Sequence, residues 1–153
     1  MNRYRGEQVL VSMLFMACLS SEIFAPQQKS STSKKFAVIY GSGGGFTGMA
    51  NGYIIYSDGN VEKWSGLYFR RSKIEKLGAA TPKTLLPLQN VFNSRAYKKW
   101  KHQGAGNMTT RVWCISGKDT TVVSWKGMEP GQEVPQPIRD FYSALKSVVQ
   151  SVK

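Results

Sequence analysis

The sequence predicts an α+β fold: an antiparallel sheet of about four to five strands, with a middle helix and a C-terminal amphipathic helix packed on one face. Runs rich in Val, Ile, Thr and Trp come in pairs joined by tight turns, as in hairpins. Strands and helices follow in the order strand, glycine loop, hairpin, helix, hairpin, helix, which is typical of this class. The 153 residues are 41% hydrophobic and 12% aromatic, enough for one packed domain.

The N-terminus has the pattern of a secretory signal and is set apart from the fold. Arg3 and Arg5 precede the apolar run 9–19, which is too short to span a membrane as a helix. We therefore predict a signal peptide over residues 1–17 and export of the protein to the cell envelope or the medium.

The signal ends in Phe15-Met16-Ala17-Cys18, which resembles a bacterial lipobox. In such proteins the cysteine after the small residue becomes the lipidated first residue of the mature chain. The resemblance implies a lipid anchor at Cys18 and attachment of the protein to a membrane. The alternative is ordinary cleavage further on, for example near Ala25, with Cys18 discarded.

A polar segment separates this signal from the folded part of the chain. Residues 18–35 are rich in Ser, Gln, Thr and Lys and contain nothing that forms a core. Such a composition predicts a flexible tether. We expect a single α+β domain over residues 36–153.

The domain begins with a predicted strand over residues 36–40, which leads into the glycine-rich stretch 40–48. A hairpin is predicted over residues 53–64. Its turn is Asp58-Gly59, a strong signal because both central positions of such a turn tolerate positive φ. So many glycines close together indicate a corner of the sheet, a close backbone approach, or a loop that presents Phe46.

The middle segment, 66–106, contains one predicted helix and an ambiguous basic stretch over 70–77 without a clear period. Thr81 is a good N-cap and Pro82 suits the first turn. Pro87 conflicts with that start, because a proline inside a helix lacks a backbone N–H to donate; the helix alternatively begins near Leu85. The apolar positions that keep helical spacing are Leu85, Leu88, Val91 and Phe92.

The last part of the chain predicts a second hairpin and a terminal helix. The strands cover residues 108–116 and 120–125, joined by Gly117-Lys118-Asp119, and a Pro/Gly-rich loop follows. The helix begins at Pro137, and one apolar face should cover the sheet. Its apolar residues are Ile138, Phe141, Tyr142, Leu145, Val148, Val149 and Val152.

Cysteine and histidine offer little for catalysis. Cys114 lies in an apolar strand, where a lone cysteine is usually an inert core residue, and a disulfide to Cys18 would require the signal to be retained. His102 is the only histidine, in a lysine-rich run typical of a solvated surface. No cluster of acids, histidines or cysteines indicates a metal site or an acid–base pair. The sequence argues against an enzyme.

The glycine stretch also fails as a cofactor site. Gly43-x-Gly45-x-x-Gly48 matches the dinucleotide-binding pattern after a strand, but that pattern needs a helix to hold the pyrophosphate. A hairpin follows here instead, and there is no Gly-Lys-Ser/Thr of a phosphate-binding loop. We expect no cofactor.

The net charge of +12 favours acidic partners or anionic surfaces. Basic residues interleave with aromatic ones in a composition typical of a nucleic-acid surface. The alternative is a solvated basic surface around core aromatics, and a secretory signal favours it over nucleic acid. The residues concerned are Arg95, Tyr97, Lys98, Lys99, Trp100, Lys101, Arg111 and Trp113.

The stretch Ser42-Gly43-Gly44-Gly45-Phe46-Thr47-Gly48 after a first strand resembles the Ser-Gly-Gly-Phe-Ala-Gly opening of the emfourin family. Emfourins are small protein inhibitors of thermolysin-type metalloproteases, and the order of elements is similar over roughly residues 36–152. The resemblance implies a protein partner, an extracellular metalloprotease, bound through Gly44, Gly45, Phe46 and Gly48.

Three classes of function therefore remain open. The first is an exported, envelope-anchored binding module, with protease inhibition as its specific form. The second is a structural or interaction lipoprotein in which the glycines only turn a corner. The third, which the secretory signal disfavours, is a basic nucleic-acid-binding domain.

Overall fold

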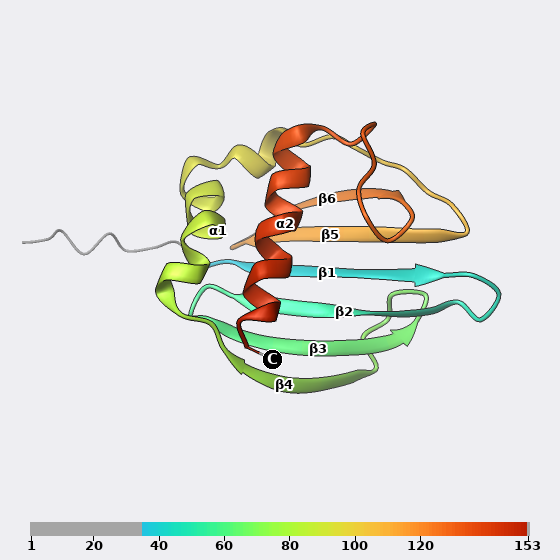
Figure 1. Ribbon diagram of the computed structural model, residues 1–153, viewed down its shortest axis with the longest axis horizontal. Helices are drawn as coiled ribbons and strands as arrows, with labels where there is room; N and C mark the ends of the chain where they lie inside the picture. The colour runs from blue at the N-terminus through green and yellow to red at the C-terminus, as the bar shows by residue number, and fades with distance from the viewer. Residues whose placement is uncertain (1–34, 153) are drawn as a thin grey trace, which may run out of the picture. The chain divides into compact units, whose positions relative to one another are not determined.

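The computed structural model describes residues 35–152, and Figure 1 gives the arrangement of their helices and strands. The predicted signal peptide 1–17, the anchor at Cys18 and nearly all of the tether 18–35 lie outside the described residues. The elements are β1 (Ala37–Gly44), β2 (Met49–Tyr56), β3 (Asn60–Leu67), β4 (Lys73–Ala79), α1 (Pro82–Ser94), the 3-10 helix η1 (Ala96–Lys99), β5 (Met108–Ser116), β6 (Asp119–Lys126) and α2 (Gln136–Gln150).

Six strands form one antiparallel sheet in the order β4-β3-β2-β1-β5-β6, with β1 near its centre. The α+β prediction is confirmed, and the number of strands is higher than the four to five expected. The strand that sequence inspection missed is β4 (Lys73–Ala79), an edge strand whose residues are almost all exposed. Because neither of its faces is buried, β4 has no alternation of apolar and polar residues to recognise.

The central strand β1 continues through Gly44 instead of ending at Tyr40, so part of the glycine stretch belongs to the sheet. Glycine is needed at position 41 because the indole of Trp64 lies across it. A Cβ added there would come within 2.5 Å of Trp64 Cζ2. The indole N–H of Trp64 donates to the carbonyl oxygen of Tyr40 at 3.3 Å, which fixes this close packing.

Both predicted hairpins are confirmed: β2 pairs with β3, and β5 pairs with β6. At the first turn the N–H of Gly59 donates to the carbonyl of Tyr56 at 3.0 Å. Of the two turn residues only Gly59 takes a positive φ. The carboxylate of Asp58 instead accepts the N–H of Asn60 at 3.0 Å, which is a common role of aspartate in turns.

The helix α1 begins at Pro82 after its Thr81 cap, as predicted, with the N–H of Thr84 donating to Thr81 Oγ1 at 3.3 Å. Pro87 lies inside this helix, so the alternative start near Leu85 is wrong. The terminal helix α2 is confirmed and begins at Gln136. Among residues 35–152, no helix has the length and apolar character needed to cross a bilayer.

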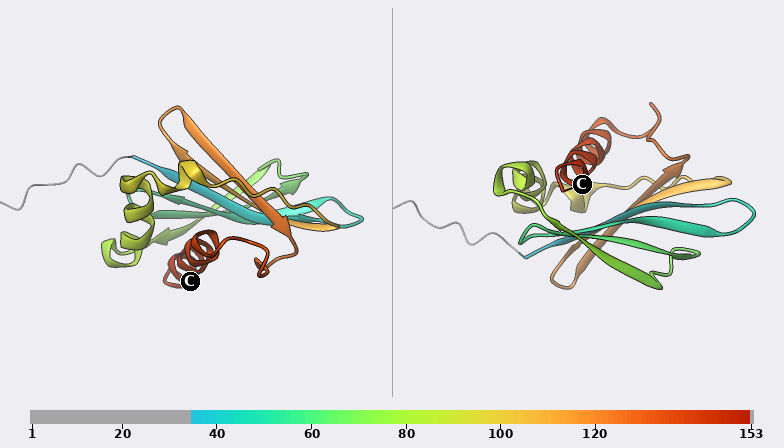
Figure 2. Two further views of the ribbon diagram at one scale, coloured as in Figure 1. Left: turned by 90° about the horizontal axis from the view of Figure 1, so that it is seen from above. Right: turned by 60° about the horizontal axis from the view of Figure 1, so that its bottom comes forward.

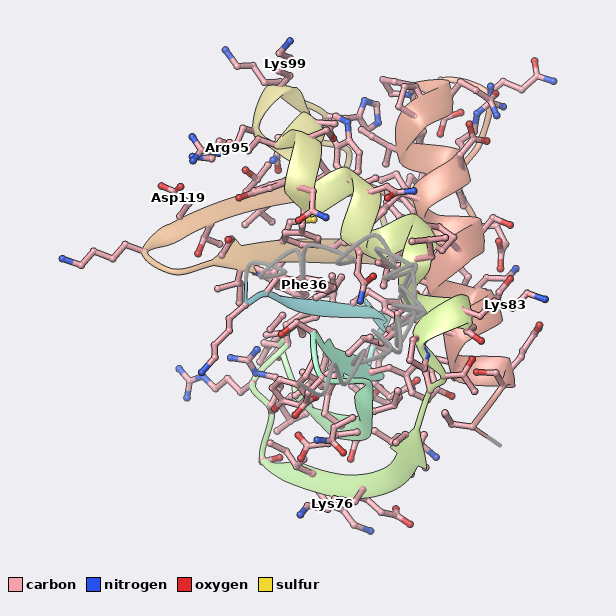
Figure 3. The ribbon with its side chains drawn as sticks, turned by 90° about the vertical axis from the view of Figure 1, so that its left-hand side faces the viewer. Phe36, Lys76, Lys83, Arg95, Lys99 and Asp119 are labelled. Carbon is pink, nitrogen blue, oxygen red and sulfur yellow. The ribbon has the colours of Figure 1, made fainter. Side chains whose placement is uncertain are left out.

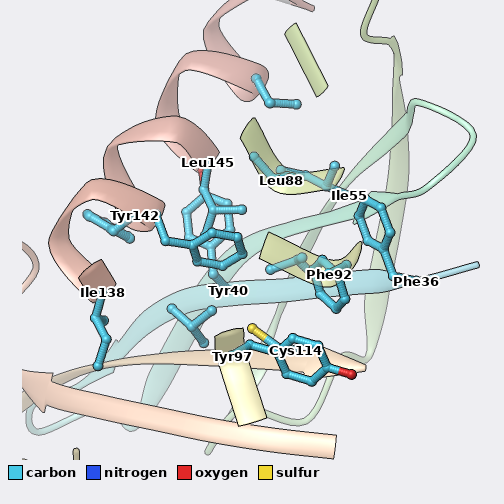
Figure 4. Packing of buried hydrophobic residues seen from close by; sticks show 14 of the residues in the cluster. Phe36, Tyr40, Ile55, Leu88, Phe92, Tyr97, Cys114, Ile138, Tyr142 and Leu145 are labelled. Atoms are coloured by element: carbon cyan, nitrogen blue, oxygen red, sulfur yellow. The ribbon is translucent and has the colours of Figure 1, made fainter. Parts of the chain in front are cut away.

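Both helices lie on the same face of the sheet, as predicted, and the main core fills the space between (Figures 1 and 2). Within this core the ring of Phe36 stacks on Phe92 with centroids 4.2 Å apart. Figure 4 shows Cys114 among these buried side chains, which confirms the prediction of a core cysteine. We call this the covered face and the opposite face of the sheet the open face.

Candidate functional site

The glycine loop, residues 45–48, joins β1 to β2 at the end of the sheet far from α1 (Figure 1). It is a tight turn in which the N–H of Gly48 donates to the carbonyl of Gly45 at 3.3 Å. Gly45 and Gly48 have φ of +67° and +64°, and Gly44 just before them has φ of +127°. Residues that carry a Cβ rarely adopt these backbone conformations, so the chain needs glycine at all three positions.

The loop is fastened by hydrogen bonds to segments on both sides. The N–H of Gly45 donates to the carbonyl of Asn107 at 2.6 Å, just before β5. On the other side, the N–H of Tyr68, just after β3, donates to the carbonyl of Gly48 at 2.8 Å. The ring of Tyr68 also lies against Gly48, where an added Cβ would be 2.6 Å from its Cε1 atom. The backbone of the turn is therefore held in place.

Phe46 projects from this turn with its ring fully exposed, 108% of the reference area. The sequence left open whether the glycines form a corner of the sheet or present a loop, and the molecule uses them for both. Gly44 ends a paired strand, whereas Gly45, Phe46 and Gly48 form the presented turn. The four residues predicted to bind a partner are thus contiguous in space, with Phe46 as the only side chain among them.

Three further exposed apolar side chains surround the loop. Met49 and Leu67 are directly opposite each other on β2 and β3 and are each about half exposed, and Tyr68 is more exposed still. We call Phe46, Met49, Leu67 and Tyr68 the apolar tip. Clustered exposed apolar side chains on a soluble domain mark interaction sites more often than scattered ones do.

A hollow of about 440 Å³ lies beside the apolar tip, lined by Leu67, Tyr68, Arg70 and Ser72. Sequence inspection missed this site because Tyr68, Arg70 and Ser72 follow β3 in an irregular segment. The partner of Met49 could not be found by counting from the predicted turn. A two-residue Asp58-Gly59 turn would pair Met49 with Tyr68, whereas the connection has three residues, 57–59, and pairs Met49 with Leu67. The position of Tyr68 was hidden as well, because its ring lies against Gly48 in another loop.

No group of three or more His, Cys, Asp or Glu side chains that could hold a metal ion occurs in residues 35–152. Cys114 is buried, and burial raises the pKa of its thiol to about 12, so the thiolate nucleophile is scarce at neutral pH. His102 is half-buried, and its backbone carbonyl accepts the N–H of Ser124 in β6 at 3.0 Å. The glycine loop has no titratable side chain.

The basic segment around η1 does not form the stacking surface that its composition resembles. Tyr97 is 1% exposed, and Trp100 packs edge-on against Phe141 with ring centroids 5.0 Å apart. These aromatics belong to the core, whereas Arg95 and Lys99 project outward at this end (Figure 3). This arrangement agrees with the alternative to a nucleic-acid surface, namely a solvated basic surface around core aromatics.

One basic side chain of this segment has a carboxylate partner. Lys98 forms an ion pair with Asp119 at the start of β6. The hydrogen bond and charge of Lys98, with a smaller effect of Arg95, hold the pKa of Asp119 below its usual value. Figure 3 shows Asp119 close to Arg95. Both members of the pair are exposed, so it contributes little to folding stability.

Comparison of the chain with protein-family models and with curated proteins gave no match. Its function is therefore inferred from its own residues.

Proposed function

We propose that this protein is an exported, non-enzymatic binding module that docks a protein partner at its apolar tip. The observation that carries the proposal is the fully exposed ring of Phe46 on a turn whose backbone is hydrogen-bonded on both sides. Burying a phenylalanine side chain contributes about 1.5–3 kcal/mol. A turn that is already ordered loses little conformational entropy on binding, so most of that contribution is retained.

The specific partner that we propose is an extracellular metalloprotease of the thermolysin type, which the protein inhibits. The support is the resemblance of residues 42–48 to the opening of the emfourins. Phe46 would enter an apolar pocket of the protease, as aromatic anchors commonly do in protein complexes. Gly45 and Gly48 would leave room for the partner's surface to approach the backbone, and Gly44 would set where the turn leaves the sheet.

The inhibition constant of the purified protein against a thermolysin-type protease tests this proposal. Phe46→Ala should raise that constant about 30-fold or more, because central aromatic anchors contribute about 2 kcal/mol or more. The matched control is Leu86→Ala, which removes a 53% exposed apolar side chain from α1, away from the tip. It should leave inhibition unchanged, and both variants should unfold at the same urea concentration as the parent.

The results test two parts of the proposal separately: Phe46 as the inhibitory contact, and a metalloprotease as the partner. Equal inhibition by the parent and Phe46→Ala would place the inhibitory contact elsewhere. If the parent inhibits no thermolysin-type enzyme, the metalloprotease assignment is wrong, and a structural or interaction lipoprotein becomes the preferred function.

Attachment to the envelope through a lipid on Cys18 and the tether 18–35 is a separate part of the proposal, and it rests on the sequence alone. Intact-mass measurement of the protein extracted from membranes tests it. The expected result is a chain that begins at Cys18 with an added diacylglyceryl group. A chain without lipid that begins near Ala25 would contradict the anchor and leave the protein extracellular.

A further inference from the structure

The open face of the sheet carries a second apolar cluster, and no helix covers it (Figure 2). Antiparallel sheets with one solvated face normally place polar residues on that face. Here the face is apolar over its central strands, and partly exposed side chains such as Trp113 and Phe69 border its buried members. Its buried members are Ile39, Ala50, Ile54 and Trp64, and its partly buried members are Tyr56, Phe69, Trp113 and Ile115.

A hollow of about 180 Å³ lies in this cluster. Phe69 forms one wall, with its ring centroid 6.3 Å from that of Trp64 and 5.8 Å from that of Trp113. The remaining lining comes from Ile39, Ile115 and Arg71. An apolar cavity of about 150 Å³ is known to hold one benzene molecule, so this hollow has room for a single aromatic ring or an alkyl group of similar size.

The loop that supplies this wall has an unfavourable backbone conformation. Tyr68 and Phe69 both have positive φ, +48° and +63°, a conformation that is unfavourable for residues other than glycine. Such conformations persist where surrounding contacts impose them, and they cluster at ligand-binding sites. At this loop the conformation places Tyr68 against the glycine loop and Phe69 across the open face.

Two arginines give the hollow a positive charge. Arg71 lines it, and the guanidinium of Arg111 lies over the ring of Phe69, with its Cζ atom 4.8 Å from the ring centroid. The ion pairs found within residues 35–152 join Lys98 to Asp119 and Lys146 to Glu129, so neither arginine has a carboxylate partner there. On this face Glu62 of β3 accepts a hydrogen bond from the hydroxyl of Tyr56 at 2.9 Å.

We propose that this hollow binds a small amphiphilic carboxylate, with one aromatic ring against Trp113 and Phe69 and its carboxylate on Arg71. The planar guanidinium of arginine suits the two oxygens of a carboxylate, and the apolar walls suit the ring. Base stacking fits less well, because Arg111 already covers a face of Phe69. The site is a different hollow from the one beside the apolar tip, although the loop after β3 contributes to both, and it requires no protein partner.

Titration of the purified protein with 3-phenylpropionate tests the proposal, followed by the NMR signal of the Trp113 indole N–H and by tryptophan fluorescence. We expect a saturable change centred on Trp113. The neutral analogue 3-phenylpropanol should bind about 10- to 100-fold more weakly, because hydrogen bonds to charged groups contribute about 1.5–3 kcal/mol. Acetate alone, which lacks the ring, should produce no saturable change.

Arg71→Gln should abolish the preference for 3-phenylpropionate over 3-phenylpropanol. The matched control is Arg70→Gln, an identical loss of charge at the adjacent residue, whose side chain lines the hollow beside the apolar tip instead. Both residues are exposed, so both variants should remain folded. The control should bind 3-phenylpropionate as the parent does.

Equal affinity for the acid and the alcohol would overturn the carboxylate assignment. An unchanged Trp113 signal at saturating 3-phenylpropionate would overturn the site itself. A single-stranded oligodeoxythymidine that shifts Trp113 more strongly than 3-phenylpropionate, with strong salt dependence, would overturn the proposal in favour of nucleic acid.

Discussion

The two faces of the sheet are built from alternate residues of the same strands, yet their surroundings differ completely. On the covered face, α1 and α2 enclose a continuous core (Figure 4). On the open face, no helix covers the smaller apolar cluster, and partly buried side chains such as Phe69 and Trp113 pack against its buried members. Neighbouring residues illustrate the difference, since Cys114 is 1% exposed and Trp113 remains partly accessible. The covered face is closed off by the helices, whereas the open face leaves Phe69, Trp113 and Ile115 partly exposed around a hollow.

The largest expected effect comes from opening a cavity on the covered face. Leu145 in α2 is 0% exposed, and Leu145→Ala should lower the free energy of unfolding by about 2–5 kcal/mol. Ile115→Ala on the open face removes a partly exposed side chain and should cost less than half as much, because water already reaches the site. Urea unfolding of the two variants measures the difference. Equal losses would show that the two faces contribute alike.

The second prediction concerns the close packing of Trp64 on β1. Gly41→Ala should destabilise the protein by about 1–3 kcal/mol, because the new methyl group would displace either the indole or the backbone of Asn51. Gly78→Ala in the edge strand β4 is the control. Its added Cβ would lie 3.7 Å from the nearest atoms, so the change should stay within about 0.5 kcal/mol. A harmless Gly41→Ala would mean that Trp64 is free to move.

The third prediction separates the Phe69 ring from its backbone conformation. Phe69→Ala should cost about 1–2 kcal/mol through lost contacts with Trp64, Trp113 and Arg111. Phe69→Gly loses the same contacts but tolerates the positive φ, so it should be more stable than Phe69→Ala by about 1 kcal/mol. Thermal unfolding at matched pH compares the two. If the glycine variant is no more stable, the loop does not carry the strain inferred for it.

The smallest effect at neutral pH belongs to the buried thiol. Burial raises the pKa of Cys114 from 9.0 to about 12, so the folded state retains a proton that the unfolded state releases in this range. Its contribution to stability is complete below pH 9.0 and is lost as the pH rises towards 12. Cys114→Val should therefore show a shallower loss of stability than the parent over that interval. The pKa of Tyr142 is also raised to about 12, but this residue is present in both proteins, so its contribution to the pH dependence of stability cancels in the comparison.

Most secondary structure was predictable because it depends on neighbours in the chain. The Thr81 cap, the Asp58-Gly59 turn and the apolar period of α2 each act within a few residues, and each was confirmed. Pro87 wrongly suggested that the helix begins near Leu85. It lies inside α1, because packing of this helix on the core outweighs the one hydrogen bond that a proline removes. The strand β4 was missed because hydrogen bonding to β3 defines it, with no buried face of its own.

The dominance of glycine over residues 41–48, with Phe46 as the single large side chain among them, can be read directly from the sequence. What those residues do depends on contacts made after folding. Trp64 requires glycine at 41, and bonds from Gly45 to Asn107 and from Tyr68 to Gly48 fasten the turn that leaves Phe46 exposed. The partners in these contacts are about twenty to sixty residues apart in the chain, so no local pattern of side chains records them. The same holds for the hollow beside Trp113, whose walls come from β1, β3, β5 and the loop after β3.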